Sequence, residues 1–145
     1  MAVRNSAKAL ILRDDAVLLT LAKLDTGEPY YVLPGGGQKA GETLAEAVVR
    51  ECREELGATV QIERLLFIRE RVEEQPHHRV EFTFLCRLLS EPDATLATEL
   101  DAHQTGIAWL PLARLTTVPF YPEGLRGRLT TILREGLTVY LGNVP

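Results

Sequence analysis

The sequence predicts an α/β domain, in the broad sense that includes α+β folds, built on a mixed β-sheet. Two observations predict it: apolar runs typical of strands surround two helical segments, and the more acidic helix lies between strand runs. At 145 residues the chain has the length of one domain, which we expect to span residues 1–145.

The composition is that of an ordinary globular chain, with 46% apolar and 25% charged residues. A net charge of −4 argues against nucleic acid as a partner, because no basic stripe is present to displace counterions. Two cysteines inside apolar patterns fit a reducing compartment, and neither a signal peptide nor a long apolar run is evident. We therefore expect a cytoplasmic protein without a membrane partner.

The first third of the chain reads as strands that lead into a glycine-rich turn. A β-type run is followed by Asp14 and Asp15 as a turn and by a second run that pairs as a hairpin. An extended segment then enters Pro34, and the glycines after it let the backbone turn sharply and approach a ligand closely. The expected segments are strands at Ser6–Leu12, Ala16–Leu21 and Tyr30–Leu33, and a turn at Gly35–Gly37.

The central helix has sequence signals at both ends. Thr43 and Glu46 form a capping box ahead of an apolar-periodic run, and Gly57 is a typical C-terminal stop, so we expect a helix over Leu44–Leu56. At about 100° per residue, one stripe of this helix is apolar and should pack on the core. That stripe consists of Ala45, Val48, Val49, Cys52 and Leu56.

A neighbouring stripe of the same helix carries Glu51, Glu54 and Glu55. Their spacing brings the carboxylates within roughly 5–6 Å of each other at Cβ. At an effective dielectric of 20, two carboxylates about 6 Å apart repel by about 3 kcal/mol, so three half-buried ones do not all stay ionised without a cation. Oxygen-only, anionic ligation suits Mg²⁺ or Mn²⁺. The competing interpretation is a solvated acidic face that Arg50 and Arg53 partly neutralise.

The second half of the chain alternates between strand-like runs and loops. Two long β-type runs joined by a polar loop should pair antiparallel, and a second helix is weakened by Gly127. The expected segments are strands at Thr59–Val72, Arg79–Leu89 and Ile107–Leu110, loops at Glu73–His78 and Ser90–Gly106, a turn at Pro111–Leu115, a helix at Leu125–Glu135 and an apolar stretch at Leu137–Leu141.

The glycines, glutamates and arginine between Gly36 and Ala58 stand at a specific set of intervals. The segment reads glycine, five residues, Glu42, seven residues, Arg50-Glu51, Cys52, one residue, Glu54-Glu55, one residue, Gly57 and Ala58. This pattern closely resembles the box that defines the Nudix hydrolase family. Lys39 stands where many members carry an acid, which puts only a minor contact in question.

The resemblance implies a fold, a reaction and a set of roles. Nudix proteins have a mixed sheet sandwiched between helices and hydrolyse a diphosphate linked to a nucleoside and another moiety, using Mg²⁺ or Mn²⁺. By match to the box, the metal ligands would be Glu51, Glu54 and Glu55, the catalytic set Glu54, Glu51, Arg50 and Glu42, and the substrate-binding backbone Gly36 and Gly37. Arg50 would orient a box carboxylate, and Glu42 would either bind the metal through water or brace the loop.

Other roles stay open at this point. Lys23 and Arg69 are candidates for clamping a distal phosphate, against ordinary surface charge. The general base is a box glutamate or one of Glu81, Glu99 and Asp101. Candidates for contact with a base or sugar are Tyr30, Tyr31, Phe67, His77, His78, His103 and Gln104, against core or solvated positions.

The substrate we expect is a small nucleotide: a nucleoside triphosphate, including damaged ones, that gives a monophosphate and pyrophosphate. Glu73 and Glu74 stand about 15 residues past the box, where ADP-ribose and dinucleoside polyphosphate subfamilies carry proline or tyrosine. The alternatives are an ADP-ribose or sugar-nucleotide pyrophosphatase and a catalytically silent nucleotide-binding module. A metal-free glycosidase is disfavoured because its two acids face each other across a cleft. A homodimer is a further expectation.

Overall fold

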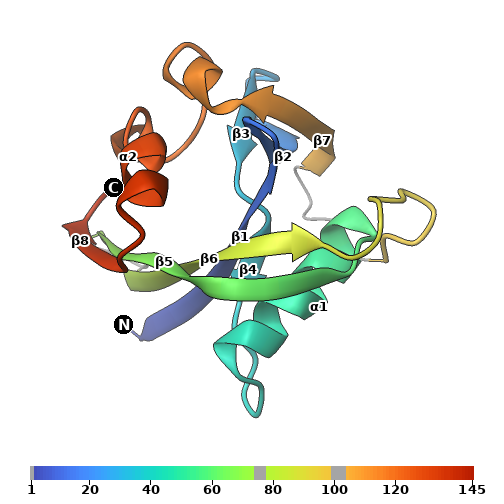
Figure 1. The fold of residues 1–145 in the computed structure, drawn as a ribbon, viewed down its shortest axis with the longest axis horizontal. Coiled ribbons are helices and arrows are strands. Elements are labelled where there is room, and N and C mark those ends of the chain that lie inside the picture. The colour runs from blue at the N-terminus through green and yellow to red at the C-terminus, as the bar shows by residue number, and fades with distance from the viewer. Residues whose placement is uncertain (1, 74–77, 99–103) are drawn as a thin grey trace.

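The computed structural model describes residues 2–73, 78–98 and 104–145 (Figure 1). These residues form eight strands, two α-helices and two short 3₁₀ helices. The strands are β1 Val3–Arg13, β2 Ala16–Lys23, β3 Pro29–Val32, β4 Gly35–Gly37, β5 Val60–Val72, β6 His78–Leu88, β7 Gln104–Pro111 and β8 Val139–Asn143. The helices are α1 Leu44–Leu56, η1 Leu112–Thr116, η2 Glu123–Leu125 and α2 Leu129–Glu135.

The strands make one mixed sheet in the order β3-β2-β1-β6-β5-β8, with β4 also paired to β1 and β7 to β2. The β1–β6 and β5–β8 pairs are parallel, and the other pairs are antiparallel. Figure 1 shows β1, β6 and β5 side by side, with β2, β3 and β7 turned away from them. The expected antiparallel pairing of the two long runs is confirmed by β5 and β6.

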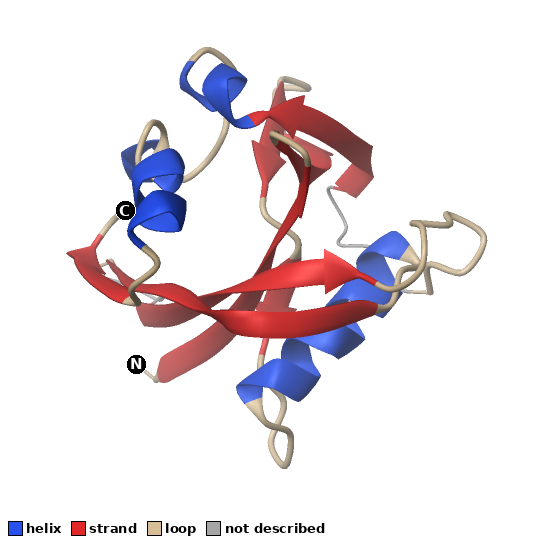
Figure 2. Cartoon of the chain, viewed as in Figure 1, coloured by secondary structure: helices blue, strands red, loops and turns tan. Residues whose placement is uncertain are grey.

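Helices pack on both faces of the sheet (Figure 2). Because side chains alternate along β1, Ala7, Ala9 and Ile11 join one core cluster with the buried residues of α1, while Leu10 joins another that contains Leu129 of α2. The expected mixed sheet between helices is therefore confirmed. No helix in the described ranges combines the length and apolar character needed to cross a bilayer.

Helix α1 has the bounds that its end signals predict. The Thr43 side chain accepts a hydrogen bond from the Glu46 N–H at 3.0 Å, and Gly57 adopts the left-handed conformation with φ 61°. The predicted core stripe is correct at Val48, Cys52 and Leu56. It is wrong at Ala45, which is only partly buried, whereas Ala47, outside the predicted stripe, is fully buried and packs with Val48 in the core.

The glycine segment differs from the expected turn. Gly35–Gly37 is a short strand, β4, that pairs antiparallel with β1 over Ser6, Ala7 and Lys8. At Gly35, φ is 136° and a Cβ would lie 2.2 Å from the Ala7 carbonyl oxygen, so only glycine allows this close approach. The glycines therefore serve strand packing as well as access.

Several expected bounds shift. The hairpin between β1 and β2 pairs only at its tip, Leu12 with Val17 and Arg13 with Ala16, which leaves the rest of β1 free to pair with β4 and β6. Helix α2 begins at Leu129 rather than Leu125 because Gly127 has φ 77° and separates it from η2. β7 begins at Gln104, inside the expected loop, because it pairs with β2 through Ala22. The expected turn at Pro111–Leu115 is mostly η1, and the last apolar stretch forms β8 two residues later than expected.

Candidate active site

The strand β4 and the last turns of α1 border a cavity of about 840 Å³. The floor of this cavity is one face of β1, β6 and β5, and Tyr30, Tyr121 and Leu125 line another part of its wall. The predicted site residues that line it are Gly36, Gly37, Glu51, Glu54, Glu55 and Arg69, together with Glu81. The structure therefore brings most of the predicted set to one concave surface.

Glu55 is held at the inner end of this surface. Its Oε2 accepts a hydrogen bond from the Gly35 N–H at 3.1 Å. Burial raises the pKa of Glu55 to about 7, the charge of Lys8 and the Gly35 N–H oppose the rise, and the nearby Glu51 adds to it. This carboxylate is the acid most in need of a neighbouring cation.

Glu51 lies directly against the glycine strand. A Cβ at Gly36 would stand 2.7 Å from Glu51 Oε1, so the missing side chain makes room for the carboxylate. Gly36 has no positive φ that would itself demand glycine. Glycine at this position is therefore required by the space that the Glu51 carboxylate occupies and not by the backbone conformation.

Arg50 gathers the remaining acids of the box. Its Nη1 donates to Glu51 Oε1 at 3.0 Å and to Glu54 Oε2 at 3.1 Å, and its Nη2 donates to the Gly37 carbonyl at 2.9 Å. The side chains of this group are only 14–19% exposed, so these charges interact more strongly than surface pairs. Arg50 thus fixes two glutamates and the glycine strand relative to one another.

Glu42 braces Arg50 from the other side. Its two carboxylate oxygens accept from Arg50 Nη2 at 2.7 Å and Nε at 3.0 Å, and Oε1 also accepts from the Lys39 N–H at 2.7 Å. The hydrogen bond from Arg50 lowers the pKa of Glu42 to about 2. Glu42 borders a neighbouring cavity and not the one described above. Of its two predicted roles, this geometry favours bracing the loop.

The donor set suits a hard divalent cation by its chemistry. Glu51, Glu54 and Glu55 offer carboxylate oxygens, and burial raises the pKa of the nearby Cys52 thiol, which keeps that sulfur protonated. Within residues 2–73, 78–98 and 104–145, no group of three or more acidic, histidine or cysteine side chains already has metal-binding geometry. Two of the three glutamates bond to Arg50, so their carboxylates must turn to close around an ion.

Arg69 and Glu81, predicted independently as a phosphate clamp and a general base, are partners. They pair across β5 and β6, and Arg69 Nη2 donates to Glu81 Oε2 at 2.6 Å. Arg69 Nη1 also donates to the Val144 carbonyl, while Arg69 Nε is buried with no partner among the described residues. Both side chains are buried on the cavity floor, so neither is an ordinary surface charge.

Other candidates lie elsewhere. Lys23 is exposed at the end of β2 and lines neither cavity. His78 bonds to Glu70 at 3.2 Å, and Gln104 donates to the Glu55 backbone carbonyl at 3.2 Å. Tyr30 and Phe67 line the cavity, and Tyr31 packs against the core. Glu99, Asp101, His77 and His103 lie outside the described residues.

Lys8 and Tyr121 are site residues that the sequence analysis missed. Lys8 Nζ donates to the carbonyls of Leu33 and Gly35, both at 3.3 Å, which places its charge near Glu55. The sequence feature that could have identified Lys8 is the presence of a lysine inside an otherwise apolar strand. Tyr121 lies edge-to-face with Tyr30, with ring centroids 5.9 Å apart. Tyr121 stands in an irregular segment between η1 and η2, where no periodicity marks it.

The loop after β6 holds the end of α1 in place. The N–H groups of Thr98 and Asp93 donate to the carbonyls of Glu54 and Leu56, at 3.1 and 3.0 Å. Gly57 packs so closely that a Cβ there would be 1.9 Å from the Asp93 carbonyl oxygen. Carbonyls that end a helix without partners are thereby satisfied, and the glutamate-bearing turn is fixed.

Known proteins resemble this chain in sequence and in fold. A family model described as NUDIX domain matches residues 3–128. The human protein named 8-oxo-dGDP phosphatase NUDT18 is 36% identical over 105 residues, covering 72% of this chain and 31% of that protein. A Methanocaldococcus jannaschii protein named ADP-ribose pyrophosphatase is 34% identical over 77 residues, covering 52% of this chain and 46% of its own length.

Among solved structures, a NUDIX hydrolase from Nitrosomonas europaea superposes with a TM-score of 0.78 at 22% identity, covering 93% of this chain and 90% of that one. At this identity the likeness concerns the fold alone. The chain spans less than half the length of each of the two named sequence relatives.

Proposed function

The chain belongs to the Nudix hydrolase family, and on that premise we propose that it hydrolyses a diphosphate linkage in a nucleotide with the help of Mg²⁺ or Mn²⁺. The observation that carries the proposal is the placement of three half-buried box carboxylates along an open glycine strand at the edge of a large cavity. Stability alone does not account for this concentration of acids.

Glu51, Glu54 and Glu55 are the residues that would hold the ion. When bound, a divalent cation neutralises the oxygens of the diphosphate and polarises the attacked phosphorus. Burial raises the pKa of Glu55 to about 7, and a cation held beside this carboxylate would favour its ionised form.

The other box residues position this set. Arg50 is bound by both oxygens of Glu42 and by the Gly37 carbonyl, and these bonds would hold it in place if Glu51 and Glu54 turned toward an ion. Gly36 and Gly37 present backbone without side chains, so a phosphoryl group can come close to this strand.

A carboxylate on this surface must take the proton of the attacking water. Glu81 and the box glutamates Glu51 and Glu54 all line the cavity. Glu81 bonds to Arg69 and Glu54 bonds to Arg50, so each of them has one carboxylate oxygen that is not bonded to an arginine. Glu54 and Glu81 are therefore both candidates for the base, and comparison of the pH–rate profiles of Glu54→Gln and Glu81→Gln distinguishes them.

The proposed substrates are nucleoside di- and triphosphates, including oxidised ones. The name of the human relative, an 8-oxo-dGDP phosphatase, supports a damaged nucleoside diphosphate, and the archaeal relative's name supports ADP-ribose as the alternative. Tyr30 and Tyr121 offer aromatic surface to a base in the same cavity.

A substrate panel tests this assignment. The purified protein is incubated with dGDP, dGTP, their 8-oxo forms and ADP-ribose, with Mg²⁺ and with chelator. The nucleoside monophosphate is quantified in each case, together with its co-product: phosphate from a diphosphate, pyrophosphate from a triphosphate and ribose phosphate from ADP-ribose. We expect the highest kcat/KM on a nucleoside di- or triphosphate and none in chelator. Faster hydrolysis of ADP-ribose than of every other compound would move the substrate to the alternative.

The cellular setting is part of the same proposal. Cys52 and Cys86 are both free and buried, as expected for a reducing cytoplasm. A homodimer is expected from the frequency of such assemblies and is measured by light scattering.

A further inference from the structure

A row of arginines crosses the floor of the cavity at its outer end. Arg4 of β1 pairs with Arg79 of β6, and Arg79 pairs with Arg71 of β5. Residues directly opposite one another on paired strands point to the same face, so three guanidinium groups share one side of the sheet. That side is the cavity floor, because Arg71 and Arg79 both line the cavity.

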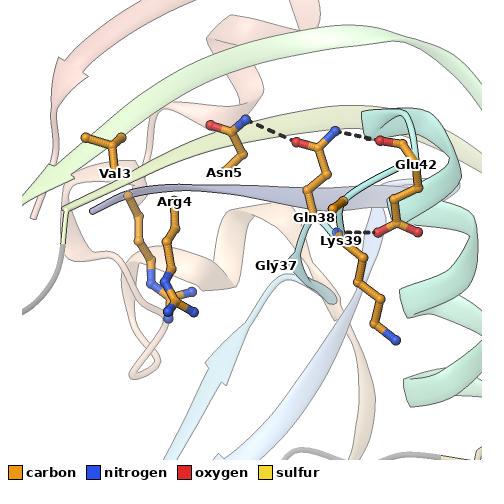
Figure 3. Close-up of a pocket in the computed structure, with 10 residues that line it drawn as sticks. Val3, Arg4, Asn5, Gly37, Gln38, Lys39 and Glu42 are labelled. Atoms are coloured by element: carbon orange, nitrogen blue, oxygen red, sulfur yellow. Dashed lines mark hydrogen bonds between the residues drawn. The ribbon is translucent and has the colours of Figure 1, made fainter. Parts of the chain in front are cut away.

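A second cavity of about 690 Å³ adjoins this row, lined by Arg4, Arg79, Lys39 and Glu42 among others. The two cavities share Gly37 and Arg79. Figure 3 shows Arg4 and Lys39 on one side of the β1 ribbon, whereas Asn5 and Gln38 point to the other. Lys39 therefore adds a fourth cation on the arginine side.

Intramolecular pairing leaves most of this charge uncompensated. Like charges directly opposite on a sheet destabilise it. Arg71 bonds to Glu73, but within the described part of the chain neither Arg4 nor Arg79 forms an ion pair, and Arg79 has only a 3.4 Å hydrogen bond to Ser6 Oγ. Burial lowers the pKa of Arg69, Glu81 opposes this shift, and the charge of Arg71 adds to it, so Arg71 acts electrostatically on the cavity floor.

The row lies well beyond Glu55, the innermost of the box glutamates. Glu55 bonds at Gly35, which pairs with Lys8, and Arg4 stands four residues along β1 from Lys8, about 13 Å at 3.3 Å per residue. Adjacent phosphoryl groups of a diphosphate share one bridging oxygen, so a diphosphate whose inner phosphoryl group lies at Glu55 ends short of the row. A phosphoryl group on the far side of a ribose can reach it.

We propose that Arg4, Arg71 and Arg79, flanked by Lys39, bind a second phosphoryl group of the substrate, carried on the 2′ or 3′ carbon of the ribose. The preferred substrates are then nucleotides with a diphosphate at the 5′ position and a phosphate ester at a secondary ribose hydroxyl. This inference rests on the hydrolase function proposed above and narrows its substrate class.

Binding of nucleotides that lack a diphosphate tests the site without turnover. Guanosine 5′-monophosphate, 3′,5′-bisphosphate and 2′,5′-bisphosphate are titrated into the protein with Mg²⁺ in a calorimeter. We expect one bisphosphate to bind at least tenfold more tightly than the monophosphate, and the tighter one identifies the 2′ or 3′ position. Arg79→Gln should bring that ratio close to one, and Arg79→Lys should keep most of it.

Arg87→Gln is the matched control, because Arg87 lies on the same strand, is exposed and lines neither cavity. Equal affinity of the wild-type protein for all three nucleotides would overturn the proposal, as would an unchanged ratio in Arg79→Gln. The hydrolase proposal fails in a different measurement: no diphosphate in the substrate panel would be cleaved. A bisphosphate preference together with that failure would leave the anion site in place and overturn only its assignment to a substrate.

Discussion

Glu81 Oε2 accepts a hydrogen bond from Arg69 Nη2 at 2.6 Å on the floor of the candidate active site. This pair is buried, with 6% of Arg69 and 8% of Glu81 exposed, so each charge depends on the other. Removing one partner leaves an uncompensated charge in a medium of low dielectric.

The first prediction concerns this pair. Arg69→Met and Glu81→Gln should each lower the free energy of unfolding by about 3–5 kcal/mol, measured by urea denaturation. The double variant, with both charges removed, should cost less than the sum of the single variants. Losses below about 1 kcal/mol in both single variants would show that the pair is solvated rather than buried.

A second prediction follows from the pKa of Glu55, which is raised from 4.5 unfolded to about 7 folded. Between these values the folded protein binds more protons than the unfolded chain, so stability falls as pH rises through this window and then levels off. The metal-free protein should lose on the order of 2 kcal/mol between pH 4.5 and pH 7 through this group. The Glu55→Gln variant should show a flatter profile, and an identical slope in both proteins would rule out the assignment.

Metal binding should reverse that loss. Because the cation competes with the proton at Glu55, the rise in Tm on adding Mg²⁺ or Mn²⁺ should be larger at pH 8 than at pH 5.5. Ca²⁺, as a hard cation of larger size, serves as the comparison ion. A stabilisation that does not change with pH would place the cation away from Glu55.

The contribution of Glu42 to stability depends on pH in the opposite direction to that of Glu55. The pKa of Glu42 is lowered to about 2 by Arg50, so its stabilising contribution is complete above pH 4.5 and is lost as pH falls toward 2. Glu42→Gln should therefore destabilise the protein at pH 7 and have almost no effect at pH 2. Thermal unfolding at both pH values measures the difference, and equal losses at the two would show that Glu42 acts through packing alone.

Gly36 offers a test of how Glu51 is positioned. A Cβ at Gly36 would lie 2.7 Å from Glu51 Oε1, so Gly36→Ala should displace this carboxylate and weaken Mn²⁺ binding at least tenfold. Gly37→Ala is the control, because a Cβ there meets no atom within 4 Å. Mn²⁺ affinity by electron paramagnetic resonance reports the effect, and equal weakening in both variants would mean that strand β4 itself, rather than Glu51, is perturbed.

Helix α1 could be predicted because its end signals lie within the helix itself. The features that sequence reasoning missed depend on how distant strands align with one another. The capping box of Thr43 and Glu46 and the stop at Gly57 involve contacts within one helix, so the bounds of α1 could be predicted. The strand character of Gly35–Gly37 depends on pairing with β1, and the Arg69–Glu81 bond depends on the alignment of β5 with β6. Lys8 lies near Glu55 only because β4 and β1 are neighbours.

The central claim is that Glu51, Glu54 and Glu55 hold the cation required for hydrolysis. It is tested most directly by measuring hydrolysis of the best substrate as a function of Mg²⁺ concentration in the wild type, in Glu54→Gln and in Glu46→Gln. Glu46 is an exposed residue of the same helix, and glutamine also supports a capping box, so it is a matched control. We predict no activity in chelator, a loss of at least 100-fold in Glu54→Gln and wild-type behaviour in Glu46→Gln. Full activity in chelator, or an unchanged rate in Glu54→Gln, would contradict the account.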